Sequence, residues 1–387
     1  MRTKHFVHSL PAFPVYSCAF VSPHELVLGG GGGQSKTGIK NKLRLYEVKS
    51  EDAIDLRNEL ELAAGEDVPM SMAANVEAKH IVCGVNSSLE FLKVGSNQNC
   101  RSYDVKESKI SPLVTQSTLK LDNADDDFQK ITVFSPDHTL LAVAGTKDLA
   151  LLRYPSLEPV ALPISLPKGE IYDATFSSST LVVATTVNLL IYSLPPLSEE
   201  KKSPALPELE LVNTIDRPSL PGSDAGSSFR CARFHPSDFK ILYTVINTVA
   251  PKKARKNAPK RAYICKWDTE TWKVKKYRKV SDRPLTCFDV SPSGMILAFG
   301  SSDYTVGVVD ASTFAPVITI LKAHEFPPTT LKFNPESKLL VSGSADNTIR
   351  IVSVPEYRGE SWSSWIIVIV TLLIILFAII AQQMHNS

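Results

Sequence analysis

CFDVSPSGMILAFGS (287–301) shows the pattern that decides the fold, and similar stretches are ITVFSPDHTLLAVAG (131–145), CARFHPSDFKILYTV (231–245) and LKFNPESKLLVSGS (331–344). Each has an apolar segment, a turn with Pro and a second apolar segment, which is typical of paired β-strands. Phe134 and Phe176 are 42 residues apart, the period of propeller blades. Weaker copies begin at Tyr16, Met70 and Tyr172. The sequence therefore predicts an all-β propeller of seven blades, with insertions in blades two and five.

The last copy, SGSADNTIRIVSV (342–354), resembles the WD-repeat family. The usual tryptophan of such a repeat is replaced by Val352, while the pair Trp267-Asp268 is present in blade five. The other polar positions of the repeat hold His324, Ser342 and Asp346. We interpret these residues as structural hydrogen-bonding groups and not as a catalytic triad.

Blade seven has only three predicted strands before the chain reaches its apolar end. Residues 4–10 can supply the fourth strand, because closing a propeller ring removes two open sheet edges. We therefore expect the N-terminus to complete the last blade.

WIIVIVTLLIILFAIIA (365–381) is an uncharged run of 17 residues, and as a helix it would span about 25 Å. It predicts one transmembrane helix, short enough for a thin membrane such as the endoplasmic reticulum. Arg350 and Arg358 precede the run and no Lys or Arg follows it, which places the propeller in the cytosol. The predicted order is a cytosolic propeller, a juxtamembrane linker, the helix and a short lumenal tail, at 1–357, 358–364, 365–381 and 382–387.

Composition argues against several classes of site. The net charge is +2, so no global field favours nucleic acid, and we expect no nucleic-acid partner. The six cysteines form no CxxC pair, which indicates reduced cysteines of the core. The eight histidines lack the spacing of metal ligands. No nucleophile–base pair is apparent, so we expect no small-molecule substrate and no enzyme activity.

Blade one departs from the repeat: a predicted strand ELVLGG (25–30) runs into GGGQSKTGIKN (31–41) and then into a strand KLRLYEV (42–48). The stretch has five consecutive glycines at 29–33. A mobile surface hairpin is one interpretation, and a site where backbone groups converge on an ion or partner is another. A phosphate-binding loop is a third, since GGGGQSKT (30–37) nearly fits that motif. However, Ser35 replaces the second glycine, and a strand rather than a helix follows.

A seven-bladed propeller, this glycine loop with its Gly-Ile-x-Asn-Lys ending, and a C-terminal membrane helix together resemble one family. It is the family of endoplasmic-reticulum exchange factors for the Sar-type GTPase, which start COPII coat assembly. The resemblance implies that the loop presses into the GTPase to expel GDP, with Asn41, Gly38 and Ile39 as the wedge. We expect the side chain of Asn41 to point outward. We expect no counterpart of the long lumenal domain that some fungal members of this family have.

The resemblance also implies a potassium ion in the loop. Convergent carbonyl oxygens suit a large, weakly hydrated cation, and glycines allow carbonyls to converge. The ligands would come from the glycine run, Thr37 and the Asn41 amide, with the glycines being Gly30, Gly31, Gly32 and Gly33.

Blade five contains the basic segment PKKARKNAPKRA (251–262). A solvated loop, nuclear or DNA targeting, and contact with anionic lipid are the alternatives, and the predicted membrane helix argues against a nuclear role. The segment joins the second and third strands of its blade, as the glycine loop does, so both should lie on one face.

We therefore predict a guanine nucleotide-exchange factor for a Sar-type small GTPase that initiates COPII coat assembly and ER-to-Golgi transport. It would be a single-pass protein of the endoplasmic-reticulum membrane. A passive membrane-anchored scaffold for trafficking proteins is the alternative, and stimulated GDP release distinguishes the two.

Overall fold

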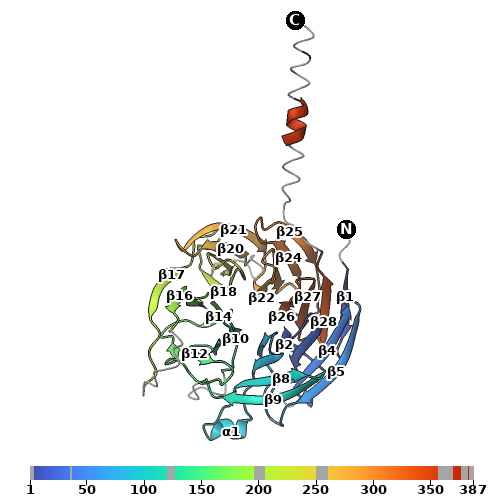
Figure 1. Ribbon diagram of the computed structural model, residues 1–387, viewed down its shortest axis with the longest axis vertical. Helices are drawn as coiled ribbons and strands as arrows, with labels where there is room; N and C mark the ends of the chain where they lie inside the picture. The colour runs from blue at the N-terminus through green and yellow to red at the C-terminus, as the bar shows by residue number, and fades with distance from the viewer. Residues whose placement is uncertain are drawn as a thin grey trace. The chain divides into compact units, whose positions relative to one another are not determined.

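The computed structural model describes residues 4–34, 37–119, 127–195, 205–249, 260–355, 369–375 and 382. The chain divides into two compact units, Met1–Val354 and Pro355–Ser387. The first unit holds seven four-stranded antiparallel sheets in a ring (Figure 1). The predicted all-β propeller of seven blades is confirmed.

Each of the first six blades uses four strands that follow one another in the sequence. Blade one holds β2 (Val15–Phe20), β3 (Glu25–Gly30), β4 (Lys42–Ser50) and β5 (Ala53–Glu61). Blade two holds β6 (Ser71–Asn75), β7 (His80–Gly84), β8 (Cys100–Lys106) and β9 (Lys109–Gln116), with the short helix α1 (Leu89–Lys93) between β7 and β8. Blade three holds β10 (Ile131–Phe134), β11 (Leu140–Ala144), β12 (Asp148–Arg153) and β13 (Ile164–Ser165).

The next three blades repeat this order. Blade four holds β14 (Ile171–Phe176), β15 (Thr180–Thr185), β16 (Asn188–Ser193) and β17 (Leu211–Asp216). Blade five holds β18 (Ser227–Phe234), β19 (Ile241–Thr248), β20 (Ala262–Asp268) and β21 (Lys273–Ser281). Blade six holds β22 (Leu285–Val290), β23 (Ile296–Ser301), β24 (Val306–Asp310) and β25 (Pro316–Ile320).

The N-terminus completes blade seven, as predicted. This blade holds β26 (Pro328–Phe333), β27 (Leu339–Ser344), β28 (Thr348–Ser353) and the N-terminal strand β1 (His5–Ser9). β1 pairs antiparallel with β28, with His5 opposite Val352 and Ser9 opposite Thr348. The first and last strands of the propeller therefore share one sheet, which leaves no open gap in the ring.

The apolar side chains pack between neighbouring blades. Val27 and Leu45 of blade one, for example, share a buried cluster with Ile81 and Tyr103 of blade two. All six cysteines are free, and Cys287 alone among them is not fully buried, as expected for core residues. Each blade is therefore held by its two neighbours.

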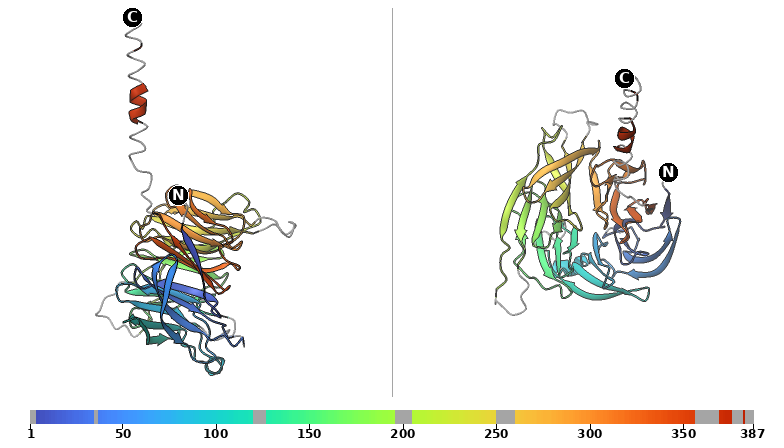
Figure 2. Two further views of the ribbon diagram at one scale, coloured as in Figure 1. Left: turned by 90° about the vertical axis from the view of Figure 1, so that its right-hand side faces the viewer. Right: turned by 45° about the horizontal axis from the view of Figure 1, so that its top comes forward.

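Antiparallel order places two kinds of connection at the same end of every blade. These are the connection from the second strand to the third and the connection from the outer strand to the next blade. The glycine loop is of the first kind, and so is the connection from β19 to β20. The end of β19 and the start of β20 therefore lie on the same face as the glycine loop, which we call the glycine-loop face. Figure 2 shows the ring from two further sides.

The predicted transmembrane helix falls largely outside the described residues. Within 365–381, residues 369–375 are helical, and the structure does not describe the linker 358–364 or most of the tail 382–387. Among the described residues, no helix is both long enough and apolar enough to cross a membrane.

Candidate functional site

The glycine run divides between a strand and a loop. Gly29 and Gly30 belong to β3 and pair with Leu43 and Lys42 of β4. A Cβ atom at Gly29 would lie 2.5 Å from Ser17 Oγ, and one at Gly30 would overlap the Pro14 carbonyl oxygen. These two glycines allow close packing inside the strand. As predicted, strand 25–30 ends at Gly30 and the loop begins at Gly31.

The Asn41 side chain holds the base of this loop together with three hydrogen bonds, which we call the clasp. Its Oδ1 accepts the Gly33 N–H at 2.9 Å, and its Nδ2 donates to the carbonyl oxygens of Gly33 at 3.1 Å and Glu66 at 2.6 Å. The residue is only 9 % exposed. The expectation that its side chain points outward was therefore wrong, because the backbone of the loop satisfies both ends of the amide. Asn41 can act on a partner only through the loop that it holds.

The connection between β5 and β6, residues 62–70, braces the clasp from the other side. The Leu62 N–H donates to the Asn41 carbonyl oxygen at 2.9 Å. Glu66 is fixed by an ion pair with Arg101 of blade two at 2.8 Å, and both side chains are largely buried. Because such a pair is more rigid than a surface pair, the carbonyl oxygen that receives the Asn41 amide is held in place by a neighbouring blade.

Asp67 faces the glycine loop from the same connection. Burial raises the pKa of its carboxyl group, while backbone N–H groups of Val68 and Gln34 act in the opposite direction. The Gln34 Nε2 atom is buried without a hydrogen-bond partner among the described residues. The interior side of the loop therefore faces the carboxylate oxygens of Asp67.

The tip of the loop remains accessible. Thr37 and Gly38 are exposed and Ile39 is half-buried, while Ser35 and Lys36 lie outside the described residues. Gly38 has φ of +76°, and no atom of the described residues lies within 4 Å of a Cβ placed there. Of the predicted wedge residues, Gly38 and Ile39 are thus accessible at the tip, and Asn41 holds the base of the loop.

Oxygen atoms gather around the backbone of Gly31 and Gly32. A Cβ atom at Gly31 would overlap Asn41 Oδ1 and lie 2.7 Å from the Lys40 carbonyl oxygen. One at Gly32 would overlap Thr37 Oγ1 and lie 2.9 Å from the Ile39 carbonyl oxygen. Such neutral oxygens are the donors that a potassium ion prefers, so the residues present fit the ion by their chemistry. Gly30, in contrast, lies in the strand ladder below this cluster.

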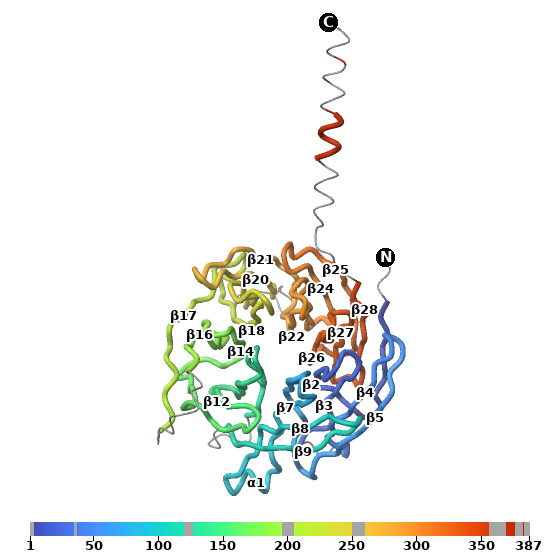
Figure 3. Tube along the Cα trace, viewed as in Figure 1, coloured from blue at the N-terminus to red at the C-terminus, as the bar shows by residue number. Residues whose placement is uncertain are grey.

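The glycine loop has two neighbours on its face that the sequence pattern did not identify. Residues 62–70 have no strong motif, and α1 lies inside the predicted insertion of blade two, where it forms a projection beside β8 and β9 (Figure 3). α1 exposes Leu89 and Phe91, and Val94, which directly follows the helix, is exposed as well. The basic segment starts from the same face between β19 and β20, but residues 250–259 lie outside the described part of the chain.

The WD-repeat positions are structural, as predicted. The His324 ring forms one hydrogen bond with Ser342 Oγ and one with Thr348 Oγ1, both at 2.8 Å. Thr348 Oγ1 in turn donates to Asp346 Oδ1 at 2.6 Å. Burial lowers the His324 pKa to about 4, with Asp346 opposing the shift. Val352 fills the tryptophan position and is fully buried. These side chains fix the last blade.

Fold and site together define a seven-bladed β-propeller that carries one braced, glycine-rich loop. The family description "WD domain, G-beta repeat" matches residues 315–353, which confirms a WD repeat in blades six and seven. A crystal structure of Chaetomium thermophilum Raptor has a TM-score of 0.64 and 13% identity, covering 93% of this chain and 30% of that one. This likeness concerns the fold alone.

The chain is similar to proteins named "Guanine nucleotide-exchange factor SEC12". The Mus musculus protein is 23% identical over 356 residues, which are 83% of this chain and 81% of that protein. The Candida glabrata protein of the same name is 30% identical over 145 residues, 35% of this chain and 30% of that protein. The resemblance predicted from the sequence is confirmed by these relatives.

Proposed function

We propose that this chain is a guanine nucleotide-exchange factor for a Sar-type small GTPase. The observation that carries the proposal is the glycine loop, which is clasped at its base and open at its tip. Support comes from relatives that are named exchange factors and that align with most of the chain.

Exchange makes no covalent bond, so the loop acts by differential binding. A factor that binds the nucleotide-free GTPase more tightly than the GDP-bound form lowers GDP affinity by the same factor. The tip at Gly38 and Ile39 would contact the GTPase, and a fixed tip loses little entropy on contact. Asn41 and the Glu66–Arg101 pair supply that fixity.

A potassium ion would fit the same role. Thr37, Asn41 and the carbonyl groups around Gly31 and Gly32 would hold it, and Gly33 offers its carbonyl beside them. When bound, the ion would supply positive charge to a cluster of oxygens and stiffen the backbone. The proposal for the ion is separable from the proposal for exchange.

We also propose that residues 365–381 anchor the propeller in the endoplasmic-reticulum membrane, with the propeller cytosolic and the tail lumenal. The uncharged run and the arginines before it support this topology. In this place the exchange activity would initiate COPII coat assembly and ER-to-Golgi transport. The anchor would resist carbonate extraction of the full chain, and release into the soluble fraction would disprove it.

The test is release of fluorescent GDP from a purified Sar-type GTPase, with the full chain in detergent. The chain should accelerate release, and Gly38→Leu should abolish most of the acceleration because the added side chain stands at the tip. Gly226→Leu is the matched control, since Gly226 is half-buried on the same face and also has positive φ. A side chain there would meet open space among the described residues. Binding of the GTPase without faster release would identify the alternative, a passive scaffold.

A further inference from the structure

The central channel of the propeller has a mouth on the glycine-loop face that is lined by hydrogen-bond donors. The channel encloses about 880 Å³, within the usual range for small-molecule sites. Five inner strands carry a β-bulge near their start, and bulges redirect side chains. The bulged residues are Tyr16, Tyr172, Arg230, Thr286 and Thr329. All five line the channel.

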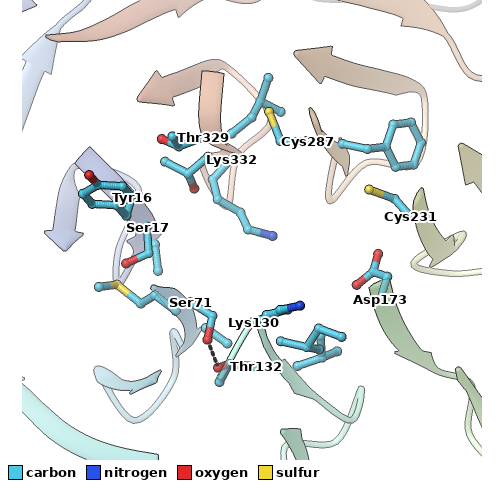
Figure 4. Close-up of a pocket in the computed structure, with 18 of the residues that line it drawn as sticks. Tyr16, Ser17, Ser71, Lys130, Thr132, Asp173, Cys231, Cys287, Thr329 and Lys332 are labelled. Atoms are coloured by element: carbon cyan, nitrogen blue, oxygen red, sulfur yellow. Dashed lines mark hydrogen bonds between the residues drawn. The ribbon is translucent and has the colours of Figure 1, made fainter. Parts of the chain in front are cut away.

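Lys130 takes the corresponding position in blade three. It directly precedes β10, and its N–H donates to the Ala144 carbonyl oxygen of the neighbouring strand at 2.9 Å. Its side chain extends into the channel, as Figure 4 shows. We call this set of six residues the mouth ring.

The mouth ring has two cations without a carboxylate partner in the described part of the chain. The Lys130 ammonium lies 5.5 Å from the Phe128 ring centre, and the Arg230 guanidinium 5.1 Å from that of Tyr172. Arg230 Nη2 also donates to the Thr286 carbonyl oxygen at 2.8 Å. Both cations therefore lie near aromatic rings, and no carboxylate of the described residues pairs with either of them.

The other charges of the channel are already compensated. Lys332 pairs with Asp289 at 3.0 Å, and Arg233 pairs with Asp173. These pairs lie further along the inner strands than the mouth ring. The uncompensated charge is thus concentrated at the mouth, where low-dielectric walls strengthen its attraction for an anion.

The hydroxyl groups of the ring differ in their availability. Thr286 Oγ1 donates to the Pro328 carbonyl oxygen and Thr329 Oγ1 to that of Val15, so both are used between blades. Across residues 4–355 as described, the hydroxyl groups of Tyr16 and Tyr172 have no hydrogen-bond partner. Two phenols, one ammonium and one guanidinium are the donors that bind phosphate oxygens.

We propose that the mouth ring binds a compact anion that carries at least two phosphate groups. Two phosphate groups are needed to reach both cations, because Lys130 lies on the third blade and Arg230 on the fifth, with Tyr172 of the fourth blade between them. A soluble inositol phosphate and a phosphorylated inositol lipid headgroup share this chemistry. The site is separate from the glycine loop and does not depend on the exchange function.

The test is calorimetric titration of the full chain in detergent with pyrophosphate, inositol hexakisphosphate and a dioctanoyl phosphatidylinositol phosphate. Lys130→Met and Arg230→Leu should each weaken binding of the best ligand about tenfold to a hundredfold, as for loss of a charged hydrogen bond. Tyr16→Phe and Tyr172→Phe keep the rings and should weaken it less. The preferred probe identifies the soluble or the lipid source.

Lys273→Met and Arg278→Leu are matched controls, because they remove the same charges from the exposed outer strand β21. Equal losses in these controls and in the ring variants would show binding to general surface charge and overturn the site. Absence of binding by all three probes would overturn it as well. Binding of a polyglutamate peptide in preference to every phosphate compound would overturn the choice of ligand. The phenylalanine variants test the site even if Arg230→Leu does not fold.

Discussion

Asn41→Ala should release the glycine loop while the propeller stays folded. The substitution removes three hydrogen bonds and leaves the Gly33 N–H and the Glu66 carbonyl oxygen without their partner. At about 0.5–1.5 kcal/mol for each bond, the closed loop loses about 2–4 kcal/mol. The ratio of open to closed loop then rises about 30- to 700-fold. Stimulated GDP release should fall by up to this factor.

Two measurements check the result together. Stopped-flow release of fluorescent GDP reports exchange, and hydrogen–deuterium exchange reports the loop. Deuterium uptake should rise at residues 33–34 and 62–67 but not in blade four, because only the clasp is lost. Asn213→Ala, which truncates an exposed asparagine of β17, is the control and should behave as the wild type. GDP release at the wild-type rate, or unchanged deuterium uptake at Gly33, would show that the Asn41 hydrogen bonds do not hold the loop closed.

Four further outcomes are expected. Gly31→Ala should slow GDP release about as much as Asn41→Ala does, because the added methyl group would overlap Asn41 Oδ1. Gly38→Ala should cost only about 1 kcal/mol of backbone strain and keep most of the exchange activity. Replacing potassium by lithium should slow exchange in the wild type and have less effect in Asn41→Ala; no effect in the wild type would remove the ion from the mechanism. In the folded protein the His324 pKa of about 4 lies below its unfolded value. The neutral His324 ring therefore contributes fully to folding stability above about pH 6.5, and this contribution is lost as the pH falls toward 4. The free energy of unfolding in urea should depend less on pH in His324→Gln than in the wild type. Deletion of residues 252–261 should leave exchange in solution unchanged and should weaken binding to anionic liposomes at low salt; equal liposome binding would eliminate a lipid role.

The blade count, the closing strand and the site of the loop could be predicted because they depend on local patterns. A turn with Pro between two apolar segments recurs wherever two strands pair, and residues 4–10 were the remaining candidate for the last sheet. The orientation of Asn41 could not be predicted in this way. Its partner Glu66 stands 25 residues further on in a segment without a motif, and Arg101, which fixes Glu66, belongs to another blade.

The division of the glycine run between strand and loop could be predicted from the strand pattern of ELVLGG (25–30), but the reason for glycine at two strand positions could not. Ser17 and Pro14 approach Gly29 and Gly30 closely, and the sequence alone does not show this contact. The channel mouth was also hidden, since each of its residues comes from a different blade and no two are close in the chain. Periodicity identifies blades, but contacts between blades depend on the closed ring.

Pairing of β1 with β28 has a consequence for the order of events during synthesis. The first strand to be made has no partner until residues 348–353 have been added, so it must wait while six blades form. The entropic cost of closing a loop grows only slowly with chain length. Pairing two strands from opposite ends of the propeller therefore reduces its stability only a little at equilibrium. During the wait, however, two strand edges stay open to other chains. A truncated product that ends before Thr348 would keep both edges exposed and should associate with itself or with chaperones.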